Sequence, residues 1–469
     1  MKTSWTVLLA MSALLLACNK PADPGSTSYI SGTVNPVFQE YLAFAYADFL
    51  DSAKIDQKGN FALDVPAREA GYGMLMYNNS MVELYIEPGK TLEINSISDN
   101  FPEKIEFGGE LGPVNHYMQL ARKLDQQTDI SSDDLYSKDP AAFCSLTDSI
   151  RNTKNRLLRE YVGKYPDMDT LFARKRATDI LYTWANQQLL YPGYYLLMKN
   201  QIPPLPDQYH KKYLDLLELN NADLLISPMY KTFLENYLDY KEAVYLDNHT
   251  EVEKLWFPGS VSRFRVINEE FTDQEIKNYL LFRAMSDHLD NFGTDHVETF
   301  ITNFRVSCTN EEYKTFIEKK FSMSELLARG KQAPELDFFD QEGNGVKLSD
   351  LKGKLLYLNF WASWSEWSIQ EFPFWEKLRK DFEGYDISFV SISMDFVKDR
   401  NKWEYILDKQ KLGGIQLIQD SESNSFTDKY FINDLPRYLL IGPDGSIISA
   451  HAPRPSENME VVLKNLLKN

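Results

Sequence analysis

The stretch that decides the fold reads WASWSEWS and occupies residues 361–368. It follows an apolar run at 355–360 that is typical of a buried strand, and apolar residues then recur at helical spacing across 372–378. A polar turn between a buried strand and a helix predicts that Ser365 is the N-cap. Its hydroxyl would accept a hydrogen bond from a backbone N–H of the first helical turn, and Ser368 would lie within that turn.

The strand-to-helix placement and the sequence FWASW at 360–364 resemble the active-site turn of TlpA-like and other thioredoxin-fold proteins. In those families the next four residues are Cys-x-x-Cys, whereas here they are Ser-Glu-Trp-Ser. Thiol–disulfide exchange needs a thiolate that attacks and a second thiol that resolves the mixed disulfide. The resemblance therefore implies a disulfide oxidoreductase frame in which the redox positions, Ser365 and Ser368, are degenerate and no catalytic residue remains.

A serine nucleophile at Ser365 is the alternative, and it would need a nearby base with an orienting partner. Of the six histidines, His451 is the only one within residues 328–469, and no G-x-S-x-G turn surrounds Ser365. We therefore interpret Ser365 as a helix cap.

Pro436 is the second landmark of this resemblance. In thioredoxin-fold proteins a proline at the start of the corresponding strand follows a cis peptide bond and faces the Cys-x-x-Cys turn, which implies that role for Leu435–Pro436. Together with Trp364, Glu366 and Trp367 it would form the groove that holds an extended segment in active relatives. Exposed tryptophans are good peptide anchors, and packing within the fold would explain both rings equally well.

The N-terminus predicts export and lipid attachment. Lys2 precedes an apolar segment of thirteen residues at 5–17, which is too short to span a bilayer and is typical of a signal peptide. The sequence LLAC at 15–18 looks like a bacterial lipobox, which implies cleavage before Cys18 and its acylation; an ordinary signal peptide cut elsewhere is the alternative. Acylation would anchor the protein to a membrane, and family resemblance favours the outer membrane, facing the periplasm.

The other two cysteines, Cys144 and Cys308, stand 164 positions apart. A disulfide in an oxidising compartment and two separate buried thiols are both compatible with that spacing. Neither has a second cysteine at catalytic spacing or a Cys/His cluster that would suggest a metal.

Composition limits the remaining possibilities. A chain of 469 residues suggests about three domains, and 43% hydrophobic residues are ample for packed cores. The net charge of −18 argues against nucleic acid or an anionic membrane surface as the main partner. No nucleotide-binding, metal-protease or EF-hand motif occurs, so we expect no cofactor and no metal.

The domain prediction has five parts: a signal peptide at 1–17, a tether at 18–28, a β-sandwich at 29–110, a helical region at 111–327 and a thioredoxin-like domain at 328–469. Short alternating strands separated by turns predict that the sandwich is small and antiparallel. Its pattern resembles the N-terminal domain that often precedes TlpA-like domains in Gram-negative lipoproteins. The fold class is therefore multi-domain α+β.

Apolar residues at three- and four-residue intervals predict the helices of the middle region, with breaks at Pro192–Gly193 and at 203–206. Three tyrosines, Tyr191, Tyr194 and Tyr195, would either pack a core or line a ligand groove.

Two classes of function follow. The first is a redox-inactive envelope protein that binds another protein or a peptide, with no nucleic-acid partner. The second is a thiol-disulfide oxidoreductase of the TlpA kind, which the family resemblance alone would imply. Because the site decides function within a fold, we favour the first, and enzyme activity is not expected. A purely structural envelope protein is a third option.

Overall fold

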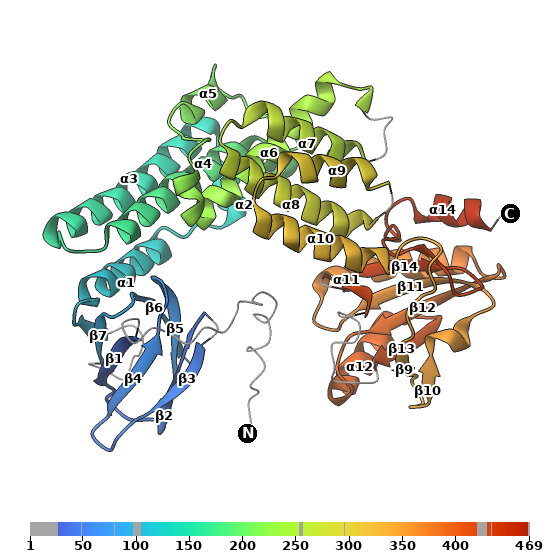
Figure 1. The fold of residues 1–469 in the computed structure, drawn as a ribbon, viewed down its shortest axis with the longest axis horizontal. Helices are drawn as coiled ribbons and strands as arrows, with labels where there is room; N and C mark the ends of the chain where they lie inside the picture. The colour runs from blue at the N-terminus through green and yellow to red at the C-terminus, as the bar shows by residue number, and fades with distance from the viewer. Residues whose placement is uncertain are drawn as a thin grey trace. The chain divides into compact units, whose positions relative to one another are not determined.

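The computed structural model describes residues 27–47, 49–78, 80–96, 105–252, 257–294, 296–419, 429–432 and 434–467. The predicted signal peptide, Cys18 and most of the tether lie outside these ranges. The chain divides into two compact units, one of residues 1–217 with 223–236 and the other of 218–222 with 237–469. Figure 1 shows N-terminal strands, then helices, then a C-terminal α/β region, which confirms the predicted fold class.

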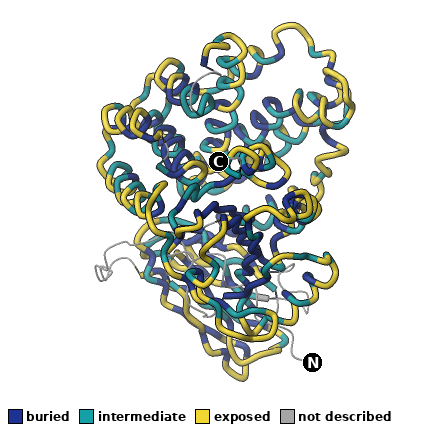
Figure 2. The backbone as a smooth tube through the Cα atoms, turned by 90° about the vertical axis from the view of Figure 1, so that its right-hand side faces the viewer, coloured by how far each residue is buried: buried dark blue, intermediate teal, exposed yellow. Residues whose placement is uncertain are grey.

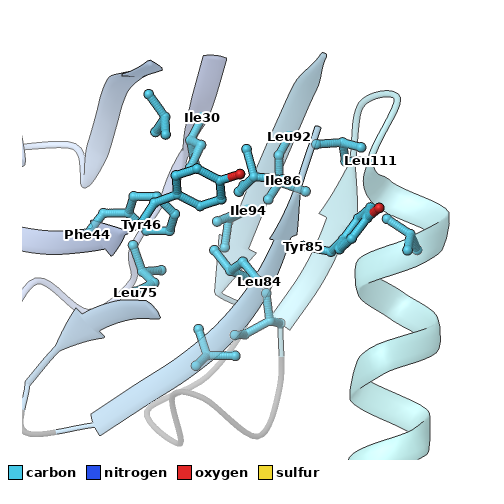
Figure 3. Packing of buried hydrophobic residues seen from close by; sticks show 14 of the residues in the cluster. Ile30, Phe44, Tyr46, Leu75, Leu84, Tyr85, Ile86, Leu92, Ile94 and Leu111 are labelled. Carbon is cyan, nitrogen blue, oxygen red and sulfur yellow. The ribbon is translucent and has the colours of Figure 1, made fainter. Parts of the chain in front are cut away.

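The N-terminal strands form two four-stranded sheets, in the orders β4-β1-β7-β8 and β3-β2-β5-β6. Figure 3 shows side chains from both sheets meeting in one apolar cluster, including Ile30 and Phe44. Period-2 alternation of buried and exposed residues along the strands produces this shared core. The strands are β1 (Thr27–Thr33), β2 (Tyr41–Tyr46), β3 (Phe49–Lys54), β4 (Asn60–Pro66), β5 (Gly71–Tyr77), β6 (Ser80–Ile86), β7 (Thr91–Ser96) and β8 (Ile105–Gly108).

The prediction of a wholly antiparallel sandwich was wrong at one strand pair. Strand β1 pairs with β7 in parallel, with Tyr29 opposite Thr91, while the other pairs are antiparallel. A parallel pair needs a long crossover connection. The strands between β1 and β7 supply it, because β2, β3, β5 and β6 belong to the second sheet.

Most helices of the middle region carry both buried and exposed residues, and Figure 2 shows the two classes alternating along the tube. This is the pattern that the apolar spacing predicts. The helices are α1 (Gly112–Gln127), α2 (Ser132–Tyr136), α3 (Pro140–Lys164), α4 (Thr170–Lys199), α5 (Tyr209–Leu214), α6 (Pro228–Asn248), α7 (Pro258–Glu270), α8 (Gln274–Phe292), α9 (Glu298–Ser307) and α10 (Glu311–Glu325).

The predicted helix break at Pro192 was wrong, because α4 continues through this residue. A proline has no N–H, so the carbonyl of Gln188, four residues earlier, loses its helical partner. The hydroxyl of Tyr209 in α5 donates to this carbonyl at 3.0 Å. A hydrogen bond from another helix thus replaces the missing one.

The C-terminal sheet has seven strands in the order β10-β9-β13-β12-β11-β14-β15. Every residue of the central strand β11 is buried, and β11 pairs in parallel with β12 and antiparallel with β14. The strands are β9 (Asp337–Phe339), β10 (Gly345–Lys347), β11 (Leu355–Trp361), β12 (Ile387–Ser393), β13 (Ile415–Gln419), β14 (Arg437–Ile441) and β15 (Ile447–Ser449).

Helices α11 (Glu366–Asp381), α12 (Arg400–Gln410) and α14 (Met459–Leu466) supply apolar side chains to the clusters on one face of this sheet. Trp375 of α11 stacks on Tyr357 of β11 with ring centroids 5.2 Å apart. A separate cluster on the other face includes Leu327, which follows α10. The sheet is therefore buried on both faces, as expected where its central strands β11, β12 and β13 run parallel.

Candidate functional site

The candidate site is the turn between β11 and α11. Trp361 is fully buried and meets Phe372 edge-on, with ring centroids 5.0 Å apart. The chain then emerges at the surface, where the side chains of Trp364 and Trp367 are 73% and 68% exposed. Glu366 is also exposed, so three of the predicted groove residues face solvent.

Ser365 is the N-cap of α11, as the sequence predicts. Its hydroxyl accepts a hydrogen bond from the backbone N–H of Ser368 at 3.4 Å, and the Ser368 hydroxyl donates to it at 2.8 Å. The two serines are almost inaccessible, at 7% and 0% exposure. No histidine is a hydrogen-bond partner of Ser365 in the described part of the chain, so a serine nucleophile there would lack its base.

The carboxylate of Asp395 forms hydrogen bonds with this turn. The sequence analysis did not identify this residue. It accepts hydrogen bonds from the backbone N–H and the hydroxyl of Ser363, both at 2.8 Å, and from the hydroxyl of Ser393 at 2.7 Å. Asp395 is only 4% exposed. A polar residue just beyond a buried parallel strand was the available signal, since such residues gather at the carboxyl edge of a sheet.

The predicted cis peptide bond between Leu435 and Pro436 is present. Strand β14 begins at the next residue, Arg437, which lies opposite Phe360 near the end of β11. The antiparallel register therefore brings the cis bond to the same edge of the sheet as the turn at 362–365. Pro436 is buried, and Leu435 packs against the core, so the predicted groove would present backbone rather than side chains here.

Arg437, which the sequence analysis also did not identify, connects the start of β14 to α8 through hydrogen bonds. Its guanidinium donates to the carbonyl of Asp290 at 2.9 Å and to the carboxylate of Asp434 at 2.8 Å, and it contacts the ring of His451. Burial, together with the charge of Arg437, lowers the pKa of His451 to about 3. His451 is therefore neutral and serves as a packing and hydrogen-bonding group beside Arg437.

The two remaining cysteines are unpaired in the described part of the chain. Cys144 and Cys308 are both free thiols, so the disulfide alternative is wrong. Their sulfurs lie 3.7 Å from Gln188 Oε1 and 3.8 Å from the carbonyl of Asn310, respectively. Burial raises the pKa of both thiols, which disfavours the reactive thiolate.

The tyrosines of α4 pack the helical region rather than line a groove. Tyr191 is fully buried, stacks on Phe143 at 4.1 Å and donates to the carbonyl of Lys138 at 2.7 Å. Tyr194 is 40% exposed and stacks on Tyr136 at 4.7 Å.

Two features are absent from the described ranges of the chain. No helix there is long and apolar enough to cross a membrane. Among the residues that the structure describes, no three His, Cys, Asp or Glu side chains gather as a metal site requires.

Residues 329–450 match the AhpC/TSA family model. The C-terminal domain is a thioredoxin-like AhpC/TSA domain. Thiol-disulfide oxidoreductase ResA from Bacillus subtilis is 28% identical over 156 residues, which are 33% of this chain and 84% of ResA. The thioredoxin-like protein YneN from the same organism is 39% identical over 70 residues, 15% of this chain and 39% of YneN. A solved thiol-disulfide oxidoreductase from Bacteroides fragilis is 27% identical, with a TM-score of 0.26, and the match covers 29% of this chain and all of that one.

Proposed function

We propose that this protein is a lipid-anchored envelope protein whose thioredoxin-like groove binds an extended protein segment without redox turnover. The observation that carries the proposal is the pairing of two exposed rings, Trp364 and Trp367, with two mutually hydrogen-bonded hydroxyls, Ser365 and Ser368. Under this proposal the two exposed rings would recognise a partner, at a turn that carries hydroxyls in place of redox-active thiols.

The absence of redox turnover follows from the side chains. We place Ser365 and Ser368 at the positions where oxidoreductases of this fold carry Cys-x-x-Cys. The three cysteines of the chain are Cys18, Cys144 and Cys308, and none lies within the domain. A hydroxyl is too weak an acid to ionise at a helix N-terminus at neutral pH, and it cannot form a disulfide.

The tryptophans support binding. Exposed indole rings desolvate well against a partner, and a buried aromatic anchor typically contributes more than 1 kcal/mol to an interface. The backbone at Leu435–Pro436 lies at the same sheet edge and would bond to an extended segment, as in other strand-addition complexes. Glu366, exposed between the two rings, would favour a segment without negative charge at that point.

Attachment at Cys18 supplies the location in this proposal: the outer membrane, facing the periplasm. The test is mass spectrometry of the protein extracted from its own membranes. An N-terminal peptide that begins at acylated Cys18 is expected, and a Cys18→Ser variant should lose both the acyl mass and membrane fractionation. An unmodified N-terminus at another position would contradict this part of the proposal.

Binding is tested with a permanently unfolded, carboxymethylated protein as the probe, added to the chain that begins at Asn19. We expect saturable quenching or enhancement of tryptophan fluorescence, and a Trp364→Ala/Trp367→Ala variant should bind at least about tenfold more weakly. A Tyr385→Ala/Tyr405→Ala variant is the matched control, because these rings are 55% and 62% exposed elsewhere on the domain. Equal binding by the two variants would contradict the proposal that Trp364 and Trp367 bind the probe.

Redox turnover is tested in parallel by insulin reduction. The natural sequence should be inactive, and a Ser365→Cys/Ser368→Cys variant should gain activity if the frame of the turn is intact. The competing function is that of a thiol-disulfide oxidoreductase, which is what the printed name of the ResA relative says of that protein. Activity in the natural sequence would establish it here and overturn our proposal.

A further inference from the structure

The two outward faces of the N-terminal sandwich differ in polarity. On the sheet β4-β1-β7-β8 the outward positions are mostly polar, such as Ser31, Asp64 and Glu93. This is the usual arrangement, since each sheet of a sandwich packs one face on the core and turns the other to water. The outward face of the second sheet, β3-β2-β5-β6, does not follow this arrangement.

Seven apolar residues lie on the outward side of β3-β2-β5-β6 and form what we term the methionine face. Strand register places Ala43 beside Met76 and Met76 beside Met81, while Ala45 lies between Leu50 and Met74. The side chains of Leu50, Met81 and Tyr41 are 59%, 54% and 50% exposed. The methionine face consists of Tyr41, Ala43, Ala45, Leu50, Met74, Met76 and Met81.

Charge is confined to the margins of this face. Lys54 on edge strand β3 lies opposite Tyr41, and Glu83 on β6 lies opposite Met74. Beyond one end of the face, the same side of the sheet is already used for packing. The rings of Tyr85 and Phe172 of α4 have centroids 4.8 Å apart, and the ammonium of Lys175 lies 4.4 Å from the ring centroid of Tyr72. Figure 3 shows Tyr85 beside α1 while Phe44, Leu75 and Leu84 lie in the core.

We infer that the methionine face rests on the surface of a lipid bilayer. The inference rests on the proposed anchoring at Cys18. Nine positions separate Cys18 from Thr27, the first residue of β1, so the tether spans at most about 30 Å even when fully extended. The two sheets of a sandwich lie about 10 Å apart. The anchored sandwich is thus held within reach of the bilayer at a high effective concentration.

The side chains of the face suit this ligand. Methionine is unbranched and adapts to an irregular apolar surface, and tyrosine prefers the boundary between lipid and water. Because the chain has a net charge of −18, attraction to anionic headgroups does not drive the contact. Burial of apolar surface drives it, so zwitterionic lipid is sufficient and the binding is insensitive to salt.

The experiment measures co-sedimentation of the chain beginning at Asn19, which lacks the acyl anchor, with phosphatidylcholine vesicles. The natural sequence binds weakly and equally at low and high salt. A Leu50→Thr/Met76→Thr/Met81→Thr variant, which keeps strand-forming residues, binds at least about tenfold more weakly. The matched control is Leu197→Gln/Ile202→Gln, because these two side chains are 78% and 82% exposed outside the methionine face.

Equal binding by the triple variant, or no binding by the natural sequence, overturns the inference. Self-association that the triple variant abolishes, without vesicle binding, also overturns it and assigns the face to a second copy. A Met81→Thr variant, altered on an edge strand only, repeats the test if the triple variant fails to fold. Peptide binding at Trp364 and Trp367 and the mass at Cys18 are measured separately, so failure of the proposed function is recognisable on its own.

Discussion

The carboxylate of Asp395 accepts three hydrogen bonds beneath the turn that presents Trp364. Two of them come from Ser363, the residue next to that tryptophan. A buried carboxylate with all its donors in place is stable, but the donors become unsatisfied if it is removed. The exposed position of the ring thus depends on a side chain more than thirty residues further along the chain.

We expect Asp395→Ala to lower the free energy of unfolding by about 2–4 kcal/mol, because two part-buried donors of Ser363 and the buried hydroxyl of Ser393 lose their acceptor. Asp395→Asn retains one acceptor oxygen and should have a smaller effect. Urea unfolding followed by circular dichroism measures both. Asp386→Asn is the control, since that carboxylate is 82% exposed and should change stability by less than about 0.5 kcal/mol. An Asp395→Ala variant as stable as the natural protein would contradict this role.

Helix α4 depends on a hydrogen bond supplied by α5. Tyr209 donates to the carbonyl that Pro192 leaves without a helical partner. Tyr209→Phe should lower the free energy of unfolding by about 1–2 kcal/mol, because the buried carbonyl of Gln188 is then unsatisfied. In a Pro192→Ala background the helix supplies its own N–H, so the same change should have a smaller effect. A double-mutant cycle measures this coupling, and strict additivity would disprove it.

The end of α8 requires a glycine for two reasons. Gly293 has φ of +64°, and a Cβ built there would lie 3.0 Å from Cδ2 of His451. Gly330 has φ of +83° with nothing within 4 Å of its Cβ position. Gly330→Ala should therefore lower the free energy of unfolding by about 1 kcal/mol through backbone strain alone, and Gly293→Ala by more. Thermal unfolding compares them, and equal losses would show that the contact with His451 is unimportant.

The second unit should lose stability in mild acid through two histidines. Burial lowers the pKa of His288 to about 4, and burial together with Arg437 lowers that of His451 to about 3. Both are neutral when folded, whereas an unfolded histidine has a pKa near 6.5. Their contribution is therefore complete above about pH 6.5 and declines as the pH falls toward the folded pKa values, by at most about 1.4 kcal/mol per pH unit for each group.

Urea unfolding at pH 7.5 and pH 5.0 tests this dependence. Carboxylates also titrate in acid, so the informative comparison is with a His288→Gln/His451→Gln variant. We expect the loss of stability between the two pH values to be smaller in the variant by about 1–3 kcal/mol. The two histidines should contribute about equally to the difference, because both folded pKa values lie below pH 5.0. An unchanged pH dependence would show that neither histidine is linked to folding.

Much of the candidate site was predictable because it depends on neighbours in the chain. A buried strand followed by Ser365 and a helical pattern is a local signal, and the cap forms as expected. The cis bond at Pro436 came from the family resemblance. Asp395 and Arg437 were missed, since their partners lie on other elements. The break predicted at Pro192 was wrong for the same reason: the compensating hydroxyl belongs to α5.

The sequence by itself determined the strand–turn–helix frame, the hydroxyls at Ser365 and Ser368 and the lack of cysteine within the domain, because side-chain chemistry and local propensity are properties of the chain. Tertiary structure decided which tryptophan rings are buried and which reach solvent. It also decided the parallel pairing of β1 with β7 and the outward direction of the methionine face. These outcomes arise from contacts between distant segments, where burial, register and hydrogen-bond satisfaction are set by the whole fold rather than by adjacent residues.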